Sequence, residues 1–101
     1  MTPLSCAVQS GFCDVVQVLL NYGAEINEKY ARGDTALQQG AQSGHKDAVE
    51  LLLKNGANIA AKNNNGQTAL YVAAQGGHKN VIQVLLDNGA RTYRRKLRSN
   101  D

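Results

Sequence analysis

Residues 33–57 read GDTALQQGAQSGHKDAVELLLKNGA, and residues 66–90 repeat the pattern as GQTALYVAAQGGHKNVIQVLLDNGA. Residues 2–24 carry the same pattern another 33 residues earlier, and no insertion breaks the register. A fixed period of this length is typical of a solenoid, in which each unit buries its apolar face only by stacking on its neighbours. Three units are about the minimum for a stable stack, so the sequence predicts one repeat domain.

The residues that begin and end helices predict two short antiparallel helices in each unit. Thr35 occupies an N-cap position, and Gln38 three residues later completes a capping-box pattern. Gly44 ends the first helix of this unit, and Gly56 ends the second in the left-handed conformation that glycine tolerates. Apolar residues at i, i+3 and i+4 give each second helix one buried face. We expect first helices over 3–10, 36–43 and 69–76, and second helices over 13–21, 46–54 and 79–87.

The segments 25–34 and 58–67 join successive units and are expected to form extended arms with a tight turn. The second arm has Asn63 at the first and Gly66 at the fourth turn position, as a type I turn prefers, whereas the first arm keeps only Gly33. With these arms the unit resembles the ankyrin repeat, which is similar to G-x-T-P-L-H-x-A-A-x-x-G-H-x-x-V-V-x-x-L-L-x-x-G-A-x-x-N. The resemblance runs from residue 2 to about residue 96.

The resemblance implies an all-α ankyrin repeat solenoid, with three stacked helix-turn-helix units joined by β-turn arms. It implies a domain over 2–96, with repeats at about 2–30, 31–63 and 64–96, and a basic polar tail end at 97–101. The family histidine of T-P-L-H is replaced by Ser5, Gln38 and Tyr71, so the hydrogen bonds it usually makes between loops are not assumed. Gly40 lies inside a first helix, where glycine costs roughly 1 kcal/mol relative to alanine, and the second unit is therefore expected to be the loosest.

The sequence offers no motif for catalysis or for binding a cofactor. His45 and His78 share a repeat position with Phe12, and neither has a cysteine or carboxylate at metal-ligand spacing, so we expect them to be structural. Cys13 aligns with lysines of the other two units and is expected to be exposed, whereas Cys6 is expected to be buried. A disulfide between them is conceivable, but reduced thiols are the commoner state in an intracellular fold. We expect a non-enzymatic protein with no cofactor and no metal.

The resemblance implies a surface for binding a protein, built from the arm tips and the exposed face of the first helices. Carried onto this chain, the surface comprises Lys29, Ala31, Arg32, Asp34, Gln42 and Ser43 in the second unit, Lys62, Asn64, Asn65, Gln67, Gln75 and Gly76 in the third, and Gln9 and Ser10 in the first. Interfaces draw most of their energy from Tyr, Trp and Arg anchors, and the candidates here are Arg32, Tyr30 and Tyr71. Alternatively, Tyr30 braces its arm, and Tyr71 fills the site of the missing histidine.

The basic residues are concentrated at the C-terminal end of the chain. Residues 1–90 hold six Lys or Arg against seven Asp or Glu, whereas residues 91–101 hold five against one. A basic cluster can bind nucleic acid or another anionic surface, or act as a nuclear-import signal; the alternative is a solvated end. Anionic-surface binding is therefore the second hypothesis for function, behind protein binding, and a purely structural spacer is the third.

The ends of the array lack the polar capping units that solenoids use for solubility. We therefore expect an excerpt of a longer array, or end-to-end self-association of the chain. The outer faces are predicted to expose Cys6, Val8 and Val15 at one end, and Val72, Val81 and Val84 at the other. The chain has no apolar stretch of about 18 residues that could span a membrane and no secretion signal, so we expect an intracellular protein, cytoplasmic or nuclear.

Overall fold

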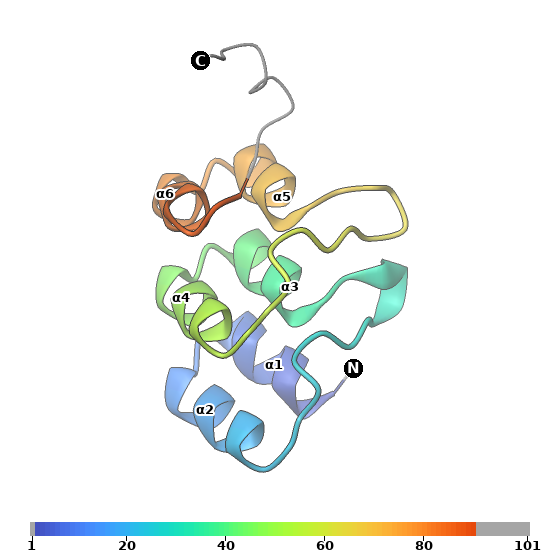
Figure 1. Ribbon diagram of the computed structural model, residues 1–101, viewed down its shortest axis with the longest axis vertical. Coiled ribbons are helices and arrows are strands. Elements are labelled where there is room, and N and C mark those ends of the chain that lie inside the picture. Colours follow the sequence, from blue (N-terminus) through green and yellow to red (C-terminus); the bar gives the residue numbers. More distant parts are fainter. Residues whose placement is uncertain (1, 91–101) are drawn as a thin grey trace.

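The computed structural model describes residues 2–90, which form three stacked pairs of antiparallel helices (Figure 1). All six helices span the residues predicted from the sequence, and the described part of the chain contains no strand. The helices are α1 (Pro3–Ser10), α2 (Cys13–Asn21), α3 (Ala36–Ser43), α4 (Lys46–Lys54), α5 (Ala69–Gly76) and α6 (Lys79–Asp87), and a short 3₁₀ turn, η1, covers Ala31–Gly33.

The helices begin and end for the local reasons that the sequence indicates. The Thr2 hydroxyl oxygen accepts a hydrogen bond from the amide of Ser5 at 3.3 Å, and satisfies one of the free donors at the start of α1. At α3 the predicted capping box is confirmed: Gln38 Oε1 accepts from the Thr35 amide at 2.7 Å. Gly44 ends α3 with φ of +75°, a conformation that other residues rarely adopt.

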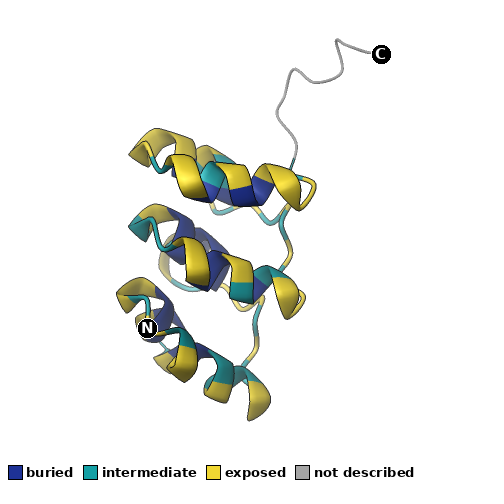
Figure 2. Cartoon of the chain, turned by 90° about the vertical axis from the view of Figure 1, so that its left-hand side faces the viewer, coloured by how far each residue is buried: buried dark blue, intermediate teal, exposed yellow. Residues whose placement is uncertain are grey.

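The helices form two layers, with α1, α3 and α5 in one and α2, α4 and α6 in the other, while the arms project from the first layer (Figure 1). Within each layer a helix packs on the equivalent helix of the next unit. The core lies between the layers, where Leu37, Leu52 and Leu85 are at most 1% exposed. Figure 2 shows this buried seam running through the stack, with exposed residues on the outer sides of the helices.

Three valines that were predicted to be exposed on the outer faces are buried. Val8 is fully buried beneath the following unit, and Val81 and Val84 are buried against the preceding one. Val72 is half-buried, while Cys6 and Val15 are exposed as expected. Periodicity locates the apolar side of a helix, but it does not say whether a given apolar residue faces the unit before it or the unit after it.

The alignment of repeat positions, which predicted a buried Cys6 and an exposed Cys13, is wrong for both cysteines, and for Cys6 the prediction from the outer face is the correct one. Cys6 is exposed and Cys13 is half-buried, and both thiols are free. The residues that occupy the position of Cys6 in the other units, Gln39 and Val72, are half-buried, and within residues 2–90 no unit precedes Cys6. Burial raises the pKa of the Cys13 thiol, and the nearby carboxylates of Asp47 and Asp14 raise it further.

Gly40 is buried in the middle of α3, where the structure gives it a packing role. A β-carbon at this position would lie 3.2 Å from Val49 Cγ2 and 3.2 Å from Val8 Cγ1. The equivalent residue of the third unit, Ala73, has the smaller Ala41 at the position that Val8 occupies. The glycine therefore makes room for the large side chain of Val8. The lower stability expected for the second unit stays a prediction.

Candidate functional site

Each arm is a β-turn loop closed by its own backbone. In the first arm, the Gly33 amide donates to the Tyr30 carbonyl oxygen at 2.9 Å, and the Tyr30 amide donates to the Asp34 carbonyl oxygen at 2.8 Å. In the second arm, Gly66 donates to Asn63 at 2.9 Å, and the Asn63 amide donates to the Gln67 carbonyl at 3.0 Å. The two arms lie side by side and project from the stack (Figure 1). The prediction of β-turn arms is confirmed.

Hydrogen bonds join the two arms at their tips. The Asn64 amide donates to the Arg32 carbonyl oxygen at 2.9 Å, and Asn63 Nδ2 donates to Asp34 Oδ1 at 3.0 Å. The approach is so close that a β-carbon on Gly33 would lie 2.5 Å from Asn64 Oδ1, which leaves room for glycine alone. The second arm is therefore held directly against the first.

Two further contacts extend the junction toward the bases of the arms. Lys29 Nζ donates to the Lys62 carbonyl oxygen at 2.7 Å. The Asn58 amide donates to Asn27 Oδ1 at 2.8 Å. Each contact joins residues about one repeat apart in the sequence, so the arms stack with the same period as the helices.

Gln38, which replaces the family histidine, makes the hydrogen bonds from its first helix to the second arm. Its Nε2 donates to the carbonyl oxygens of Ala61 at 3.2 Å and Gln67 at 2.6 Å, and the side chain is 2% exposed. A buried amide needs several partners, and here both ends of the group find them. Tyr30 is half-buried, and its hydroxyl is buried without a hydrogen-bond partner among the described residues, so burial raises its pKa. Gln38 could have been identified from the hydrogen-bonding capacity that it shares with the family histidine.

A cavity of about 100 Å³ lies between the arms and the first helices of the second and third units. It gathers six of the fourteen predicted surface residues and adds Gln38, Asn63 and Val72. The predicted residues in its lining are Arg32, Asp34, Gln42, Asn65, Gln67 and Gln75. Apart from Val72, every side chain in the lining is polar or charged, so the cavity suits a polar ligand group.

The other predicted residues lie outside the lining of this cavity and differ in exposure. The exposed members are Lys29, Ala31, Lys62, Asn64 and Gly76, with Gln9 and Ser10 on α1. Ser43 is half-buried. Among the lining residues, Gln67 is half-buried and Asp34 is 6% exposed, and both side chains hold Asn63. The structure therefore gives Asp34 and Gln67 a supporting position below the surface, while Arg32, Gln42, Asn65 and Gln75 stay accessible.

Arg32 is the one residue other than glycine with a positive φ among residues 2–90, at +66°. This left-handed conformation costs an ordinary residue roughly 1–2 kcal/mol. The hydrogen bond from Asn64 to the Arg32 carbonyl oxygen and the turn around it hold the backbone in place. The guanidinium group is exposed at the rim of the cavity, and strain of this kind often accompanies a functional position.

Both histidines have the structural role expected of them. His45 Nε2 lies 3.0 Å from the Gln9 carbonyl oxygen, and His78 Nε2 lies 3.0 Å from that of Gln42. A carbonyl accepts only, so each Nε2 carries the hydrogen. The ring of His45 covers Gly11, where a β-carbon would lie 2.9 Å from Nδ1. Within residues 2–90, no three His, Cys, Asp or Glu residues are grouped so that they could hold a metal ion.

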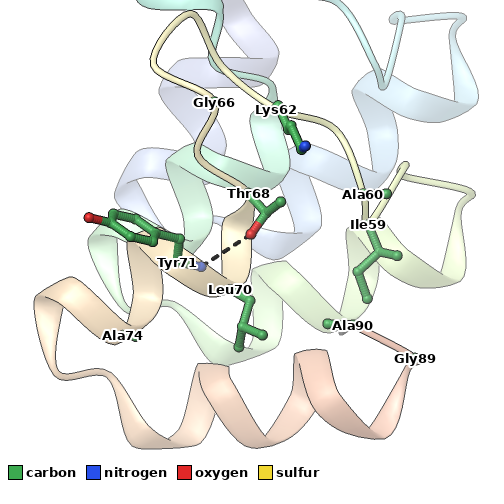
Figure 3. Close-up of a pocket in the computed structure, with 10 residues that line it drawn as sticks. All are labelled: Ile59, Ala60, Lys62, Gly66, Thr68, Leu70, Tyr71, Ala74, Gly89 and Ala90. Atoms are coloured by element: carbon green, nitrogen blue, oxygen red, sulfur yellow. Dashed lines mark hydrogen bonds between the residues drawn. The ribbon is translucent and has the colours of Figure 1, made fainter. Parts of the chain in front are cut away.

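A larger cavity, of about 540 Å³, lies at the outer end of the third unit (Figure 3). Its lining is mostly apolar and includes Ile59, Leu70, Ala74 and Ala90. Tyr71 also lines it, with 49% of the side chain exposed and the ring pointing outward from α5. Its backbone amide donates to Thr68 Oγ1 at 3.3 Å, and the filling of the missing histidine's site by Tyr71 stays a prediction.

Comparison with known proteins identifies the repeat. The family model of ankyrin repeats matches residues 4–96 with three copies. The chain belongs to the ankyrin repeat family. Ankyrin repeats are generally protein–protein interaction modules, and the family is typically non-enzymatic. No curated protein matches this ankyrin repeat chain. Among its described helices, none has the length and apolar character needed to cross a bilayer.

Proposed function

We propose that this ankyrin repeat protein is a non-enzymatic module that binds a protein partner through its arm tips and the groove beside α3 and α5. The observation that supports the proposal best is the polar cavity between the second and third units, because six of its lining residues were selected from the sequence alone. The surface proposed for contact comprises Lys29, Ala31, Arg32, Gln42, Ser43, Lys62, Asn64, Asn65, Gln75 and Gly76, with Asp34 and Gln67 supporting it from below.

The arms are suited to binding because their backbone is already fixed. Loops usually carry the functional residues of a fold, but ordering a mobile loop on binding reduces affinity. Here the Asn64 amide, the Asn63 side chain and the Lys29 ammonium group all hold one arm against the other. A partner therefore meets a preformed surface.

The charges at this surface indicate the chemistry of the partner. Arg32 is exposed at the cavity rim, and Lys29 and Lys62 are exposed near it, whereas the carboxylate of Asp34 is buried. The guanidinium group can form paired hydrogen bonds with a carboxylate. The amides of Gln42 and Gln75 can both donate and accept. We infer a partner segment that is polar, with an Asp, a Glu or a carboxyl terminus opposite Arg32.

Affinity capture from a cell extract with the intact chain, followed by titration with the captured protein, tests the proposal. Arg32→Ala, and Asn64→Ala with Asn65→Ala, should weaken binding and keep thermal stability within about 0.5 kcal/mol, as is usual for surface positions. Lys54→Ala is the matched control, since Lys54 is exposed at the end of α4 and lies outside the surface. Unchanged affinity in both arm variants would show that the binding site lies elsewhere.

The second hypothesis, anionic-surface or nucleic-acid binding, depends on Arg91, Arg94, Arg95, Lys96 and Arg98, all of which lie outside the described residues. It predicts binding that weakens steeply with salt and disappears when residues 91–101 are removed. A structural spacer, the third hypothesis, predicts that no partner is captured by either form. The same capture experiment, run with and without residues 91–101, therefore separates the three.

A further inference from the structure

Four large apolar side chains of the first unit form an exposed stripe along α2. Phe12 is 61% exposed, Val15 46%, Val18 54% and Tyr22 88%. Their spacing of three, three and four residues places them on one side of the helix. An apolar patch of this kind is unusual on a monomer and tends to mark an interaction site. We call these four residues the α2 stripe.

In the other two units three of these four repeat positions are wholly or partly covered, whereas Asn55 and Asn88, equivalent to Tyr22, are exposed. Ala48 and Val81, equivalent to Val15, are fully buried, and Val84, equivalent to Val18, is 5% exposed. The residue equivalent to Phe12 in the second unit is His45, whose ring covers Gly11 of the unit before. The α2 stripe is therefore one half of a repeat-to-repeat interface that occurs twice within the molecule.

Within residues 2–90, the other half of that interface is exposed on the third unit. Leu37 is buried, but its equivalent Leu70 is only half-buried; Ala41 is buried, but its equivalent Ala74 is exposed. Leu86 is 41% exposed on α6. Leu70 and Ala74 line the apolar cavity of about 540 Å³ (Figure 3). We call Leu70, Ala74 and Leu86 the α5/α6 face.

One position relates the two surfaces in detail. Histidine rings cover Gly11 and Gly44 at the two internal junctions, while a β-carbon on Gly77 would meet nothing within 4 Å. Phe12 occupies the histidine position and presents an aromatic ring to solvent. Gly77, which no ring covers within the described residues, is thus complementary to the exposed ring of Phe12.

We propose that a second copy of this chain docks head to tail, with the α2 stripe of one copy on the α5/α6 face of the other and Phe12 over Gly77. The junction continues the packing of α2 on α4 and of α4 on α6. It uses a different surface from the arm tips, so it stands independently of the proposed function. Because the two contact surfaces differ, each added copy leaves a new free end, and assembly continues with concentration instead of stopping at a dimer.

Sedimentation velocity of the full chain over a range of concentrations tests the inference. The wild type should show a sedimentation coefficient that rises steadily with concentration. Val15→Glu with Val18→Glu blocks the α2 stripe, and Ala74→Glu with Leu86→Glu blocks the α5/α6 face. Each double variant should weaken association by about tenfold or more, because a carboxylate buried without a partner is costly. An equimolar mixture of the two double variants should form a one-to-one dimer, since one variant keeps its α5/α6 face and the other keeps its α2 stripe.

The control is Asn21→Glu with Asn80→Glu, which adds the same charge at repeat positions that are exposed in all three units. It should associate like the wild type. All substituted side chains are exposed, and circular dichroism verifies that each variant is folded. A wild type that stays monomeric at every concentration overturns the proposal. So does a symmetric dimer that survives the block of the α5/α6 face, since like surfaces would then meet.

Discussion

The side chain of Val8 occupies the space that a β-carbon on Gly40 would need. Its Cγ1 atom would lie 3.2 Å from that carbon, closer than the ordinary contact distance between carbon atoms. The glycine and the valine thus fit each other across the junction between the first and second units.

Because Gly40 and Val8 are in contact, the effects of replacing them on the free energy of unfolding should not be additive. Gly40→Ala gains up to about 1 kcal/mol of helix propensity, but overpacking a tight core typically costs 1–3 kcal/mol, so the single change should be neutral or destabilising. In a Val8→Ala background the same change should stabilise. We expect a favourable coupling energy of about 1 kcal/mol from denaturant melts of the four proteins. Additive effects would show that Val8 adjusts freely.

Leu52→Ala should be severely destabilising, because Leu52 is fully buried in the unit that has neighbours on both sides. Such a truncation typically costs roughly 2–5 kcal/mol, a large part of the stability of a small domain. Leu86→Ala provides the comparison, since Leu86 is 41% exposed and should lose much less. Urea denaturation measures both. A loss below about 1 kcal/mol for Leu52→Ala would contradict the placement of the core.

Arg32→Gly and Arg32→Ala remove the same guanidinium group but differ in what they do to the backbone. Glycine adopts a φ of +66° without strain, whereas alanine does not, so the glycine variant should be more stable than the alanine variant by about 1 kcal/mol. At the neighbouring Ala31, which has no positive φ, glycine should instead destabilise. Thermal unfolding of the three variants tests this. Equal stability of the two Arg32 variants would mean that the turn relaxes.

The Cys13 thiol should titrate at higher pH in the folded protein than in the unfolded one, because burial, Asp47 and Asp14 raise its pKa. The thiol form is thus favoured by folding, and the stability it contributes is present below the unfolded pKa of about 8.5 and is lost as pH rises through the folded pKa. In a Cys6→Ser background, alkylation rate against pH reports on Cys13 alone.

Asp47→Asn should move the alkylation midpoint of Cys13 to lower pH, since the carboxylate that opposes the thiolate is removed. Glu50→Gln, which removes a charge from the exposed side of α4, is the control and should leave the midpoint in place. An unchanged midpoint in Asp47→Asn would assign the raised pKa to burial and Asp14.

The helices and the arms could be predicted from the sequence because their signals are local. Thr35, Gln38 and Gly44 fix the ends of one helix through bonds and dihedral angles within a few residues. The period of 33 then extends each local prediction to the other units. For the candidate site, the positions of the arm tips follow from the same period.

Contacts between units could not be predicted in the same way. Val8 and Cys6 are both on α1, yet one is buried by the following unit and the other is exposed, and only the direction of stacking separates them. The burial of Asp34 likewise depends on Asn63, 29 residues further along the chain. The bridge made by Gln38 likewise depends on the next unit, because its partners Ala61 and Gln67 lie 23 and 29 residues further along the chain.

The two histidine bridges also set the order in which the molecule should come apart. His45 and His78 each fasten a second helix to the first helix of the preceding unit, so the middle unit is fastened on both sides and the outer units on one. Local opening follows the number of contacts that must be broken, and in a chain of coupled units it starts at the ends. Amide hydrogens of α3 and α4 should therefore exchange with deuterium last, which is the opposite of the loose second unit that the low helix propensity of Gly40 predicts. The proposed binding groove, which spans the junction of the second and third units, would keep its shape only while the third unit stays folded.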